Sequence, residues 1–265
     1  MLEFDYETLL VTRPEEHVTV VTLNRPERSN AISTQMGRDL RDLFSGLYVK
    51  SEGVRCIVLT GSGTRSFCAG ADLKERNEMT NEAWREQHAI FEQHVRAMMD
   101  CPVPIIAAVN GAAYGGGLEM ILTADFIYSA KSARFALTET SLGIMPGAGA
   151  TQNLPRACGV RRAKEIIFTA EAFAAEQALE WGIVNKICEP ETLMQDALAT
   201  ARRIASNAPL AVRQAKKAVG AALDLDLKSG FVFELEAYNQ LVPTRDRLEG
   251  IRAFNEKRKP DFRGE

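Results

Sequence analysis

Two glutamates and a run of three glycines have the residue types and spacing for acid–base catalysis. Gly115-Gly116-Gly117 shortly precedes Glu119, and Glu139 stands before a second glycine-rich stretch. A glycine backbone at the start of a helix lets a ligand oxygen approach free N–H groups at the positive end of the helix dipole. Two carboxyl groups can divide acid and base roles when their environments separate their proton affinities. The pattern predicts a site that stabilises an oxyanion and transfers protons. The alternative is that the glycines only allow two elements to pack closely, and that Glu119 is in the first turn of a helix because the helix dipole favours an acidic residue there.

Other candidate motifs are weaker. The small-residue turn from Ser66 to Glu75 could supply a second N–H donor, or be only a loop with a helix cap at Asp72. Gly61-Ser62-Gly63 lacks the third glycine of a dinucleotide-binding loop, and neither GxxxxGK[ST] nor GxSxG occurs. The three histidines lack a zinc-binding spacing, so we expect no metal and interpret each as a surface or packing residue. They are His17, His88 and His94.

Short β-rich segments that alternate with helical patterns must position these residues. Strands are expected at Val18–Leu23, Cys56–Leu59, Ile105–Val109, Phe126–Ser129, Arg134–Ala136 and Ile183–Ile187. Helices are expected at Met36–Leu47, Asn81–Met99 and Leu118–Leu122. Beyond Thr151 the remaining pattern is helical, and residues 245–265 are interpreted as a solvated terminal helix. The sequence therefore predicts an α/β domain with a helical appendage.

Composition excludes several classes of protein. The chain of 265 residues has 46% hydrophobic and 25% charged residues and a net charge of −3, so it lacks the overall positive field typical of nucleic-acid or membrane binding. Its five cysteines are scattered without CxxC, and its start is not basic, so a reducing, cytoplasmic location is expected. The longest apolar run, Val103–Val109, is far shorter than the ~20 residues that cross a bilayer.

Several motifs in order and spacing resemble the crotonase, or enoyl-CoA hydratase/isomerase, family along nearly the whole chain. They are Leu23-Asn24-Arg25-Pro26 with Asn30-Ala31, Phe67 to Leu73, Ala107 to Gly111, Gly115 to Glu119, Asp125, Pro146 to Gly149, Thr151-Gln152 and Gly182 to Asn185. The resemblance implies a spiral of ββα repeats as the catalytic core, residues 1–200. It also implies a helical C-terminal region, residues 201–265, that forms homotrimers or dimers of trimers and covers the active site.

The same resemblance assigns roles to residues. Ala69 and Gly116 match the two backbone donors that bind the thioester oxygen, and Glu119 and Glu139 match the catalytic carboxyl pair of the family's hydratases. Hydration of a 2-enoyl-CoA to 3-hydroxyacyl-CoA is therefore expected, with Glu139 donating a proton to C2 and Glu119 activating water. Double-bond isomerisation or another crotonase-type acyl-CoA reaction is the alternative.

Coenzyme A is part of the substrate, so the resemblance implies no separate cofactor. The expected contacts to coenzyme A are Gly70, Ala71 and Asp72 at the turn, with Arg25, Arg28 and Lys74 as phosphate contacts. Ala150 and Asn153 depart from the usual glycine and arginine of the family, which leaves the detailed shape of the pocket open.

Within the family, the chain most resembles the methylglutaconyl-CoA hydratase branch, which includes an RNA-binding homologue. The resemblance is carried by Phe67 to Arg76, Gly115 to Met120, Thr244 to Gly250 and Phe254 to Arg258. A branched, carboxylate-bearing substrate such as 3-methylglutaconyl-CoA would need a cation, for which Arg76 and Arg85 are candidates. The lysine row of the RNA-binding homologue is broken here by Arg38, Arg41 and Asp42, so RNA binding is not expected.

Overall fold

The strand order shows how the chain coils. The computed structural model describes residues 5–51 and 53–265. One six-stranded sheet has the order β1-β2-β3-β5-β7-β10, and a four-stranded sheet has the order β4-β6-β8-β9. The strands of the large sheet are β1 Leu9–Glu15, β2 Val18–Leu23, β3 Cys56–Gly61, β5 Ile105–Val109, β7 Phe126–Ala130 and β10 Lys186–Cys188. Those of the small sheet are β4 Ser66–Cys68, β6 Ala112–Tyr114, β8 Arg134–Ala136 and β9 Phe173–Ala174.

Three successive strand pairs, β3/β4, β5/β6 and β7/β8, each place their first strand in the large sheet and their second in the small sheet. Helices follow each pair, so the chain winds as a spiral of ββα repeats. Within the large sheet only β1 and β2 are antiparallel; the other neighbours are parallel. The predicted crotonase-like α/β fold is confirmed.

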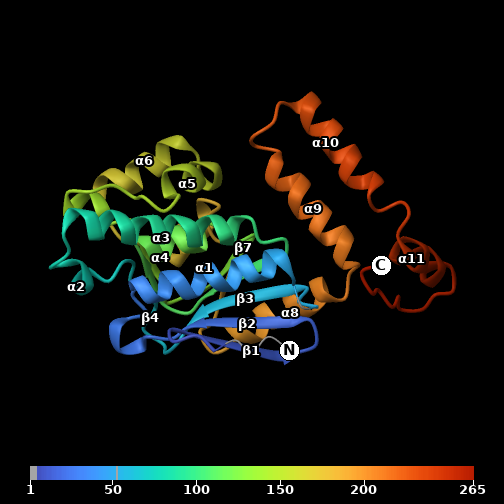
Figure 1. The fold of residues 1–265 in the computed structure, drawn as a ribbon, viewed down its shortest axis with the longest axis horizontal. Coiled ribbons are helices and arrows are strands. Elements are labelled where there is room, and N and C mark those ends of the chain that lie inside the picture. Colours follow the sequence, from blue (N-terminus) through green and yellow to red (C-terminus); the bar gives the residue numbers. More distant parts are fainter. Residues whose placement is uncertain (1–4, 52) are drawn as a thin grey trace.

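Helices cover the sheets and complete the spiral (Figure 1). In the first part of the chain they are η1 Pro26–Arg28, α1 Thr34–Val49, α2 Leu73–Arg76, α3 Asn81–Met99, α4 Gly116–Ile121 and η2 Glu139–Leu142. They continue as α5 Ala150–Cys158, α6 Val160–Thr169, α7 Ala175–Glu180 and α8 Leu193–Ala205. Ser33 and Thr80 begin α1 and α3 by accepting hydrogen bonds from first-turn amides. These two helices pack against each other, and their buried apolar side chains join the main core.

The central strands β3 and β5 are buried along their whole length, as continuous apolar strands of a parallel sheet require. Close approach between the sheets and α4 depends on glycine. A Cβ at Gly117 would overlap the backbone oxygen of Cys68 in β4, so no larger residue fits there. This contact sets the start of α4 directly against the small sheet.

Most expected elements are found. β2, β5, β8 and α3 have the predicted bounds, and the expected strand at 183–187 is reduced to β10. β1 and the short strands β6 and β9 were not expected from sequence. β9 interrupts the region beyond Thr151 that was interpreted as helical, because its Phe173 pairs with Phe135 of β8.

The C-terminal region begins later than the expected residue 201. Helix α8 crosses that position and packs as one unit on the large sheet, where Leu193, Ala197 and Ala201 join a buried cluster. Three helices then leave the body: α9 Pro209–Ala221, α10 Leu227–Asn239 and α11 Arg245–Asn255. Figure 1 shows α9 and α10 side by side, projecting from the spiral. We call residues 209–255 the C-terminal arm.

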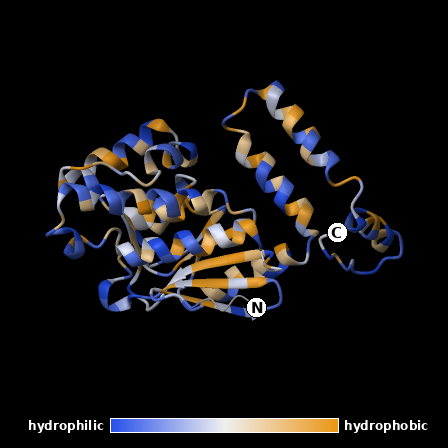
Figure 2. Ribbon diagram, viewed as in Figure 1, coloured by the Kyte–Doolittle hydropathy of each residue, from blue (hydrophilic) through white to orange (hydrophobic). Residues whose placement is uncertain are grey.

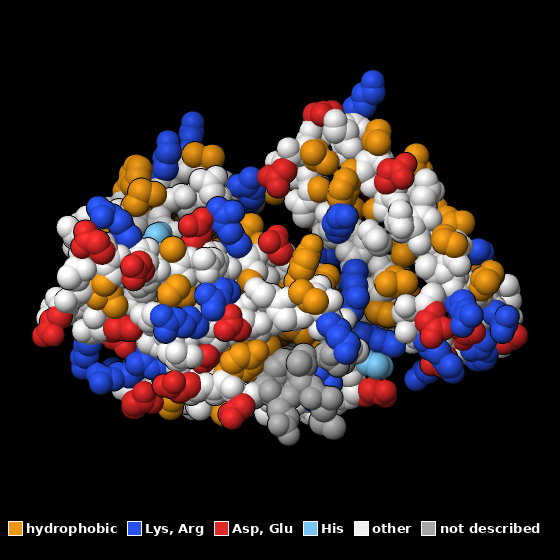
Figure 3. Space-filling model, viewed as in Figure 1, with side chains coloured by type: hydrophobic (Ala, Val, Ile, Leu, Met, Phe, Trp, Pro, Cys, Tyr) orange, Lys and Arg blue, Asp and Glu red, His pale blue; other side chains and the backbone are white. Residues whose placement is uncertain are grey.

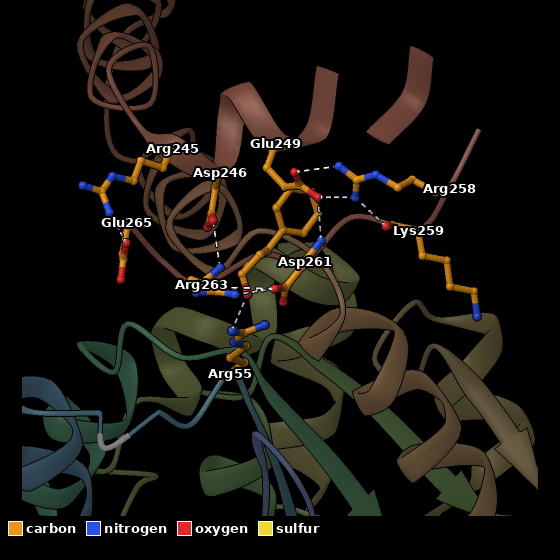
Figure 4. Close-up of polar contacts among 10 residues, drawn as sticks. Arg55, Arg245, Asp246, Glu249, Arg258, Lys259, Asp261, Arg263 and Glu265 are labelled. Atoms are coloured by element: carbon orange, nitrogen blue, oxygen red, sulfur yellow. Dashed lines mark hydrogen bonds and ion pairs between the residues drawn. The ribbon is translucent and has the colours of Figure 1, made fainter. Parts of the chain in front are cut away.

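The prediction of a terminal helix through residue 265 is wrong beyond Asn255. The last ten residues instead fold back as an irregular tail (Figure 4). Arg55 of the body donates to Phe262 O at 2.7 Å, and Glu249 of α11 pairs with Arg258 at 2.6 Å. Asp246 accepts hydrogen bonds from the amides of residues 263 and 264, both at 2.8 Å. These bonds satisfy backbone groups of the tail without helical structure.

The arm contains many apolar residues, drawn as orange segments of its helices (Figure 2), and several of their side chains are exposed. Phe231, Leu235 and Tyr238 of α10 are 61%, 57% and 64% exposed, and their spacing places them on one side of the helix. Within residues 5–51 and 53–265, no helix is long and apolar enough to cross a membrane.

Candidate active site

A cavity of about 680 Å³ lies between one face of α3 and the start of α4 and contains most of the predicted site. Its wall includes Glu119, Glu139, Gly116 and the turn from Ala69 to Ala71. The cavity is completed by α3 on one side and by residues 142–148 on another. The fold thus brings together two glutamates that are twenty positions apart in sequence.

Glu119 is a buried carboxyl held by backbone amides. It lies in the first turn of α4 and is 3% exposed. Its Oε1 accepts hydrogen bonds from Ala148 N at 2.8 Å and Ala150 N at 3.0 Å. Burial raises the pKa of Glu119, while these amides and the nearby His88 act in the opposite direction. One oxygen is thereby fixed, and the carboxyl can still exchange a proton at the other.

Glu139 is a buried carboxyl with an unsatisfied oxygen. It begins η2, is 9% exposed, and its Oε2 has no hydrogen-bond partner in the described part of the chain. Burial raises the pKa of Glu139 to about 7, and the charge of Glu119 also raises it. A Cβ at Gly115 would stand 3.0 Å from Glu139 Oε1, so the glycine leaves room for this carboxyl. Glu139 can therefore carry a proton near neutral pH.

The backbone donors differ from the prediction at one position. The amide of Ala69 already donates to Ser29 O at 3.0 Å, so the prediction that Ala69 binds an oxyanion is wrong. Within residues 5–51 and 53–265, the amides of Ala71 and Gly116 have no acceptor. Ala71 N lies 3.8 Å from where a Cβ of Gly116 would stand, so the two segments are adjacent. The free pair of donors is thus Ala71 and Gly116.

The turn that presents Ala71 is held rigidly by its neighbours. Ile32 N donates to Gly70 O at 2.8 Å, and Asp72 N donates to Ile32 O at 3.0 Å. Arg25 pairs with the Asp72 carboxylate at 3.0 Å and donates to Ala31 O at 2.6 Å. The carboxylate of Asp72 also caps α2. Burial alone would raise the pKa of Asp72, but the bond from Arg25 and the capping amides lower it below its ordinary value.

The residues expected to contact coenzyme A therefore fall into two groups. Gly70 and Ala71 line the cavity, whereas Arg25 and Asp72 hold the turn through each other. Arg28 and Lys74 are exposed, and in the described ranges their side chains have no hydrogen-bond or ion-pair partner. These two cations are the ones free to bind phosphate groups.

Helix α3 contributes cavity residues that sequence reasoning missed. The ring of His88 lies against Gly147, next to the amide that holds Glu119, so its interpretation as a surface or packing residue is incomplete. His94 is buried beside Phe91, and burial lowers its pKa to about 4, so its ring is neutral. The spacing of Trp84, His88 and Phe91 at three and four residues could have indicated this shared helix face.

Over residues 5–51 and 53–265, no group of three or more His, Cys, Asp and Glu side chains is placed to hold a metal ion. The five cysteines are free thiols. The two glutamates and the free amides of Ala71 and Gly116 stand together at the cavity.

Comparison with known proteins places this geometry in a family. The model of the family described as enoyl-CoA hydratase/isomerase matches residues 13–265. A short-chain-enoyl-CoA hydratase from Clostridium acetobutylicum is 39% identical over 250 residues, covering 94% of this chain and 95% of the relative. The human mitochondrial methylglutaconyl-CoA hydratase is 38% identical over 256 residues, covering 94% of this chain and 74% of the relative.

A solved structure agrees with these matches. The crystal structure of an enoyl-CoA hydratase from Bacillus anthracis superposes with a TM-score of 0.96 at 41% identity, covering 98% of this chain and all of that chain. The family that the sequence motifs predicted is confirmed. This chain is an enzyme of the enoyl-CoA hydratase/isomerase family, the crotonases.

Proposed function

We propose that this protein is an enoyl-CoA hydratase, which adds water across the 2,3 double bond of a 2-enoyl-CoA thioester to give 3-hydroxyacyl-CoA. The observation that carries the proposal is the pair of buried carboxyls in one cavity, in unlike environments. Glu119 has one oxygen bound by two amides, whereas Glu139 has an oxygen without a partner and a pKa near neutrality. Such a pair can activate water and supply a proton in the same turnover.

The free amides of Ala71 and Gly116 supply the electrostatic part of the reaction. As water attacks C3, the electron pair of the double bond moves toward the thioester, and negative charge develops on the carbonyl oxygen. Two N–H donors aimed at that oxygen would each contribute about 3 kcal/mol to the transition state. The rigid hydrogen bonds around Ile32 and Asp72 keep the Ala71 donor in place before the substrate arrives.

The two glutamates divide the proton transfers. Glu119 accepts a proton from water as the oxygen bonds to C3, because its carboxylate is stabilised by amides and oriented toward the cavity. Glu139 donates its proton to C2 and completes the 3-hydroxyacyl thioester. The proton is then returned from Glu119 to Glu139 through exchange with solvent. Positioned groups of this kind contribute about 10²- to 10⁴-fold in rate.

The substrate is carried by coenzyme A, with Gly70 and Ala71 lining the entrance and Arg28 and Lys74 as phosphate contacts. The resemblance to methylglutaconyl-CoA hydratase supports including the branched, carboxylated 3-methylglutaconyl-CoA among the candidate substrates. Isomerisation of a 3-enoyl thioester is the alternative reaction, and it would need no bound water between the carboxyls.

The decisive experiment is a hydration assay with crotonyl-CoA and 3-methylglutaconyl-CoA, followed by loss of the absorbance of the conjugated thioester. Glu119→Gln and Glu139→Gln should each lower kcat by about 10²- to 10⁴-fold, since a neutral isostere keeps volume but removes proton transfer. Thermal unfolding at pH 5, where the folded parent keeps the Glu139 proton, should remain close to that of the parent. Movement of a 3-enoyl double bond without incorporation of labelled water would contradict the proposal.

We also propose that the arm joins copies of this chain into a homotrimer or a dimer of trimers. Its exposed apolar side chains support a protein partner. RNA is not proposed as a partner, because Arg41 of α1 is paired with Asp42 at 2.8 Å and the face drawn in Figure 3 mixes positive and negative side chains. Salt-sensitive gel shifts with RNA would contradict that expectation.

A further inference from the structure

One wall of the cavity contains a buried arginine without a carboxylate partner. Arg76, the last residue of α2, is 8% exposed and lines the cavity. Its guanidinium carbon lies 4.2 Å from the centroid of the Trp84 ring and 5.3 Å from that of Phe91. Both aromatic rings come from α3, so the planar cation is packed between the two helices. A buried charge without a partner destabilises the folded protein, so a bound anion would compensate this cation.

The hydrogen bonds around Arg76 leave one edge of its guanidinium free. Its Nε donates to Gln87 Oε1 at 2.6 Å, the one hydrogen bond of this side chain within the described residues. Gln87 is itself fixed, because its Nε2 donates to Thr34 Oγ1 at 2.8 Å and to Glu75 Oε2 at 3.2 Å. The fork of Nη1 and Nη2 therefore has donors to spare, in the geometry that binds a carboxylate through two bonds.

Glu75, the adjacent acidic residue, does not neutralise this cation directly. Its carboxylate accepts hydrogen bonds from Thr34 N at 3.0 Å and from Gln87, and it forms no ion pair with Arg76 in residues 5–51 and 53–265. Burial lowers the pKa of Arg76, and the charge of Glu75 acts the other way. An arginine nevertheless stays protonated in proteins, so a full positive charge faces the cavity.

We propose that Arg76 determines substrate specificity by binding a carboxylate at the far end of the acyl chain. The preferred substrates are then short dicarboxylic 2-enoyl-CoA thioesters rather than monocarboxylic ones of the same length. This inference rests on the proposed hydration of 2-enoyl thioesters and names the substrate class that the same cavity selects.

The position of Arg76 beside α3 suits a short acyl chain. Trp84, which stacks on Arg76, precedes His88 by four residues, so the two are separated by about 6 Å along the helix axis. His88 in turn lies against Gly147, beside the amides that hold Glu119. Because Arg76 also contacts Phe91, three residues after His88, its guanidinium lies at about the level of His88 along α3. Arg76, Glu119 and Glu139 line the same cavity of about 680 Å³, so a short acyl chain held at the carboxyl pair would have its far end in the space that Arg76 borders.

The other charged groups of this wall are less suited to the role. Arg85 lies at the cavity too, but its side chain is 77% exposed and 4.0 Å from Glu82, so solvent screens its charge. Glu92 is paired with Arg96 one helical turn along α3. Glu119 and Glu139 would repel a carboxylate, which directs the acid end of a substrate away from them and toward Arg76.

The test compares two thioesters that differ only in the charge at the end of the acyl chain. Glutaconyl-CoA ends in a carboxylate, and 5-methylhex-2-enoyl-CoA replaces that carboxylate with an isopropyl group of similar shape. The parent enzyme should show a kcat/KM for glutaconyl-CoA that is higher by roughly 10- to 100-fold, the range for hydrogen bonds to a charged group.

Arg76→Met removes the charge at similar length, and it should abolish this preference while retaining turnover of the isopropyl thioester, which also shows that the variant folds. Arg76→Lys keeps the charge without the fork and should retain only part of the preference. Arg85→Met tests the exposed cation and should leave the preference nearly intact. Arg161→Met, at an exposed arginine of α6 that does not line this cavity, is the matched control.

Binding of the saturated analogues, glutaryl-CoA and 5-methylhexanoyl-CoA, separates this inference from the proposed reaction. Calorimetry should give tighter binding of glutaryl-CoA to the parent but not to Arg76→Met, whether or not hydration occurs. Equal affinity and equal turnover of the charged and uncharged thioesters would overturn the role of Arg76 and leave hydration standing. Loss of the preference in Arg85→Met but not in Arg76→Met would overturn it as well.

Discussion

The spiral body and the C-terminal arm use apolar residues in opposite ways. In the body, strands β3 and β5 are wholly buried and the main core runs through both sheets. In the arm, α10 buries only Ala237 among its described side chains, while Phe231, Leu235 and Tyr238 face outward. The body therefore encloses its main core within one chain, whereas the arm exposes an apolar surface that supports the proposed contact between copies.

The largest expected effect comes from adding one methyl group in each region. Gly117→Ala places a Cβ onto the backbone oxygen of Cys68 in the body, and it should destabilise the fold by about 3 kcal/mol or more. Gly230→Ala adds the same group in open space on α10 and should stabilise that helix by about 0.5–1 kcal/mol. Urea unfolding of both variants measures the contrast.

An equal loss of stability in the two glycine variants would contradict this difference in packing between the body and the arm. It would mean that the open side of α10 is already filled, in which case the Gly230 variant should also change its oligomeric mass. Light scattering on the same samples distinguishes that outcome from a change within the chain.

The second prediction concerns the exposed stripe of the arm. Phe231→Glu combined with Leu235→Glu introduces two charges on one side of α10, where a contact between copies would have to desolvate them. The mass in solution should fall toward the 29.2 kDa of a single chain, while the circular dichroism and unfolding of the body stay unchanged. A parent protein that already has the mass of one chain would refute the partner-bound arm.

The third prediction tests the connection between the two regions. Arg55→Met removes the hydrogen bonds from the body to Phe262 O and Ala205 O, and it should weaken attachment of the tail by about 1–3 kcal/mol. Proteolytic cleavage beyond Asn255 should accelerate, with hydration activity nearly retained. Arg245→Met removes an ion pair to Glu265 from a side chain that is 83% exposed, so its cleavage rate should match the parent.

The last comparison concerns pH, and its effects have opposite signs in the two regions. Glu139 has a pKa of about 7 against an ordinary 4.5, so between these values the unfolded chain releases a proton that the folded body keeps, and stability falls as pH rises. Urea unfolding at pH 5 and pH 8 should show this loss in the parent and not in Glu139→Gln.

Where the arm meets the tail, Arg258 lowers the pKa of Glu249 of α11 to about 2. The stability that this ion pair contributes is therefore present above pH 4.5 and is lost as the pH falls through 4.5 toward 2. Glu249→Gln mimics the acid form at neutral pH and should expose the tail to proteases slightly more than the parent does. Protection that increases in this variant would contradict the role of the ion pair.

Sequence alone predicted those parts of the fold that have long, regular patterns. The bounds of β2 and α3 follow from β-branched residues and from a helical period over nineteen positions. β6 and β9 have three and two residues, too few for any period to show, and they exist because neighbouring strands supply hydrogen bonds. Tertiary pairing, rather than local propensity, creates such strands.

The site was predictable in its side chains and less so in its backbone. The glycine run before Glu119 identified the cavity, but the choice between Ala69 and Ala71 depended on Ser29, a residue forty positions away whose carbonyl occupies one amide. Ser29 has a left-handed backbone conformation with φ of 53°, which no feature of its sequence predicts. The burial of Arg76 likewise requires α3 to be in place.

The alternation of strands between the two sheets fixes the spacing of the two amide donors and leaves the segment between them free to differ. Ala71 follows β4 and Gly116 follows β6, which are neighbours in the small sheet, so consecutive coils of the spiral fix the spacing of their amides. The segment from Leu73 to Met99 lies between these positions in the sequence and supplies one wall of the cavity. Single substitutions at Arg76 or Trp84 can therefore change this wall of the cavity while the two amides, which lie on other segments, keep their places.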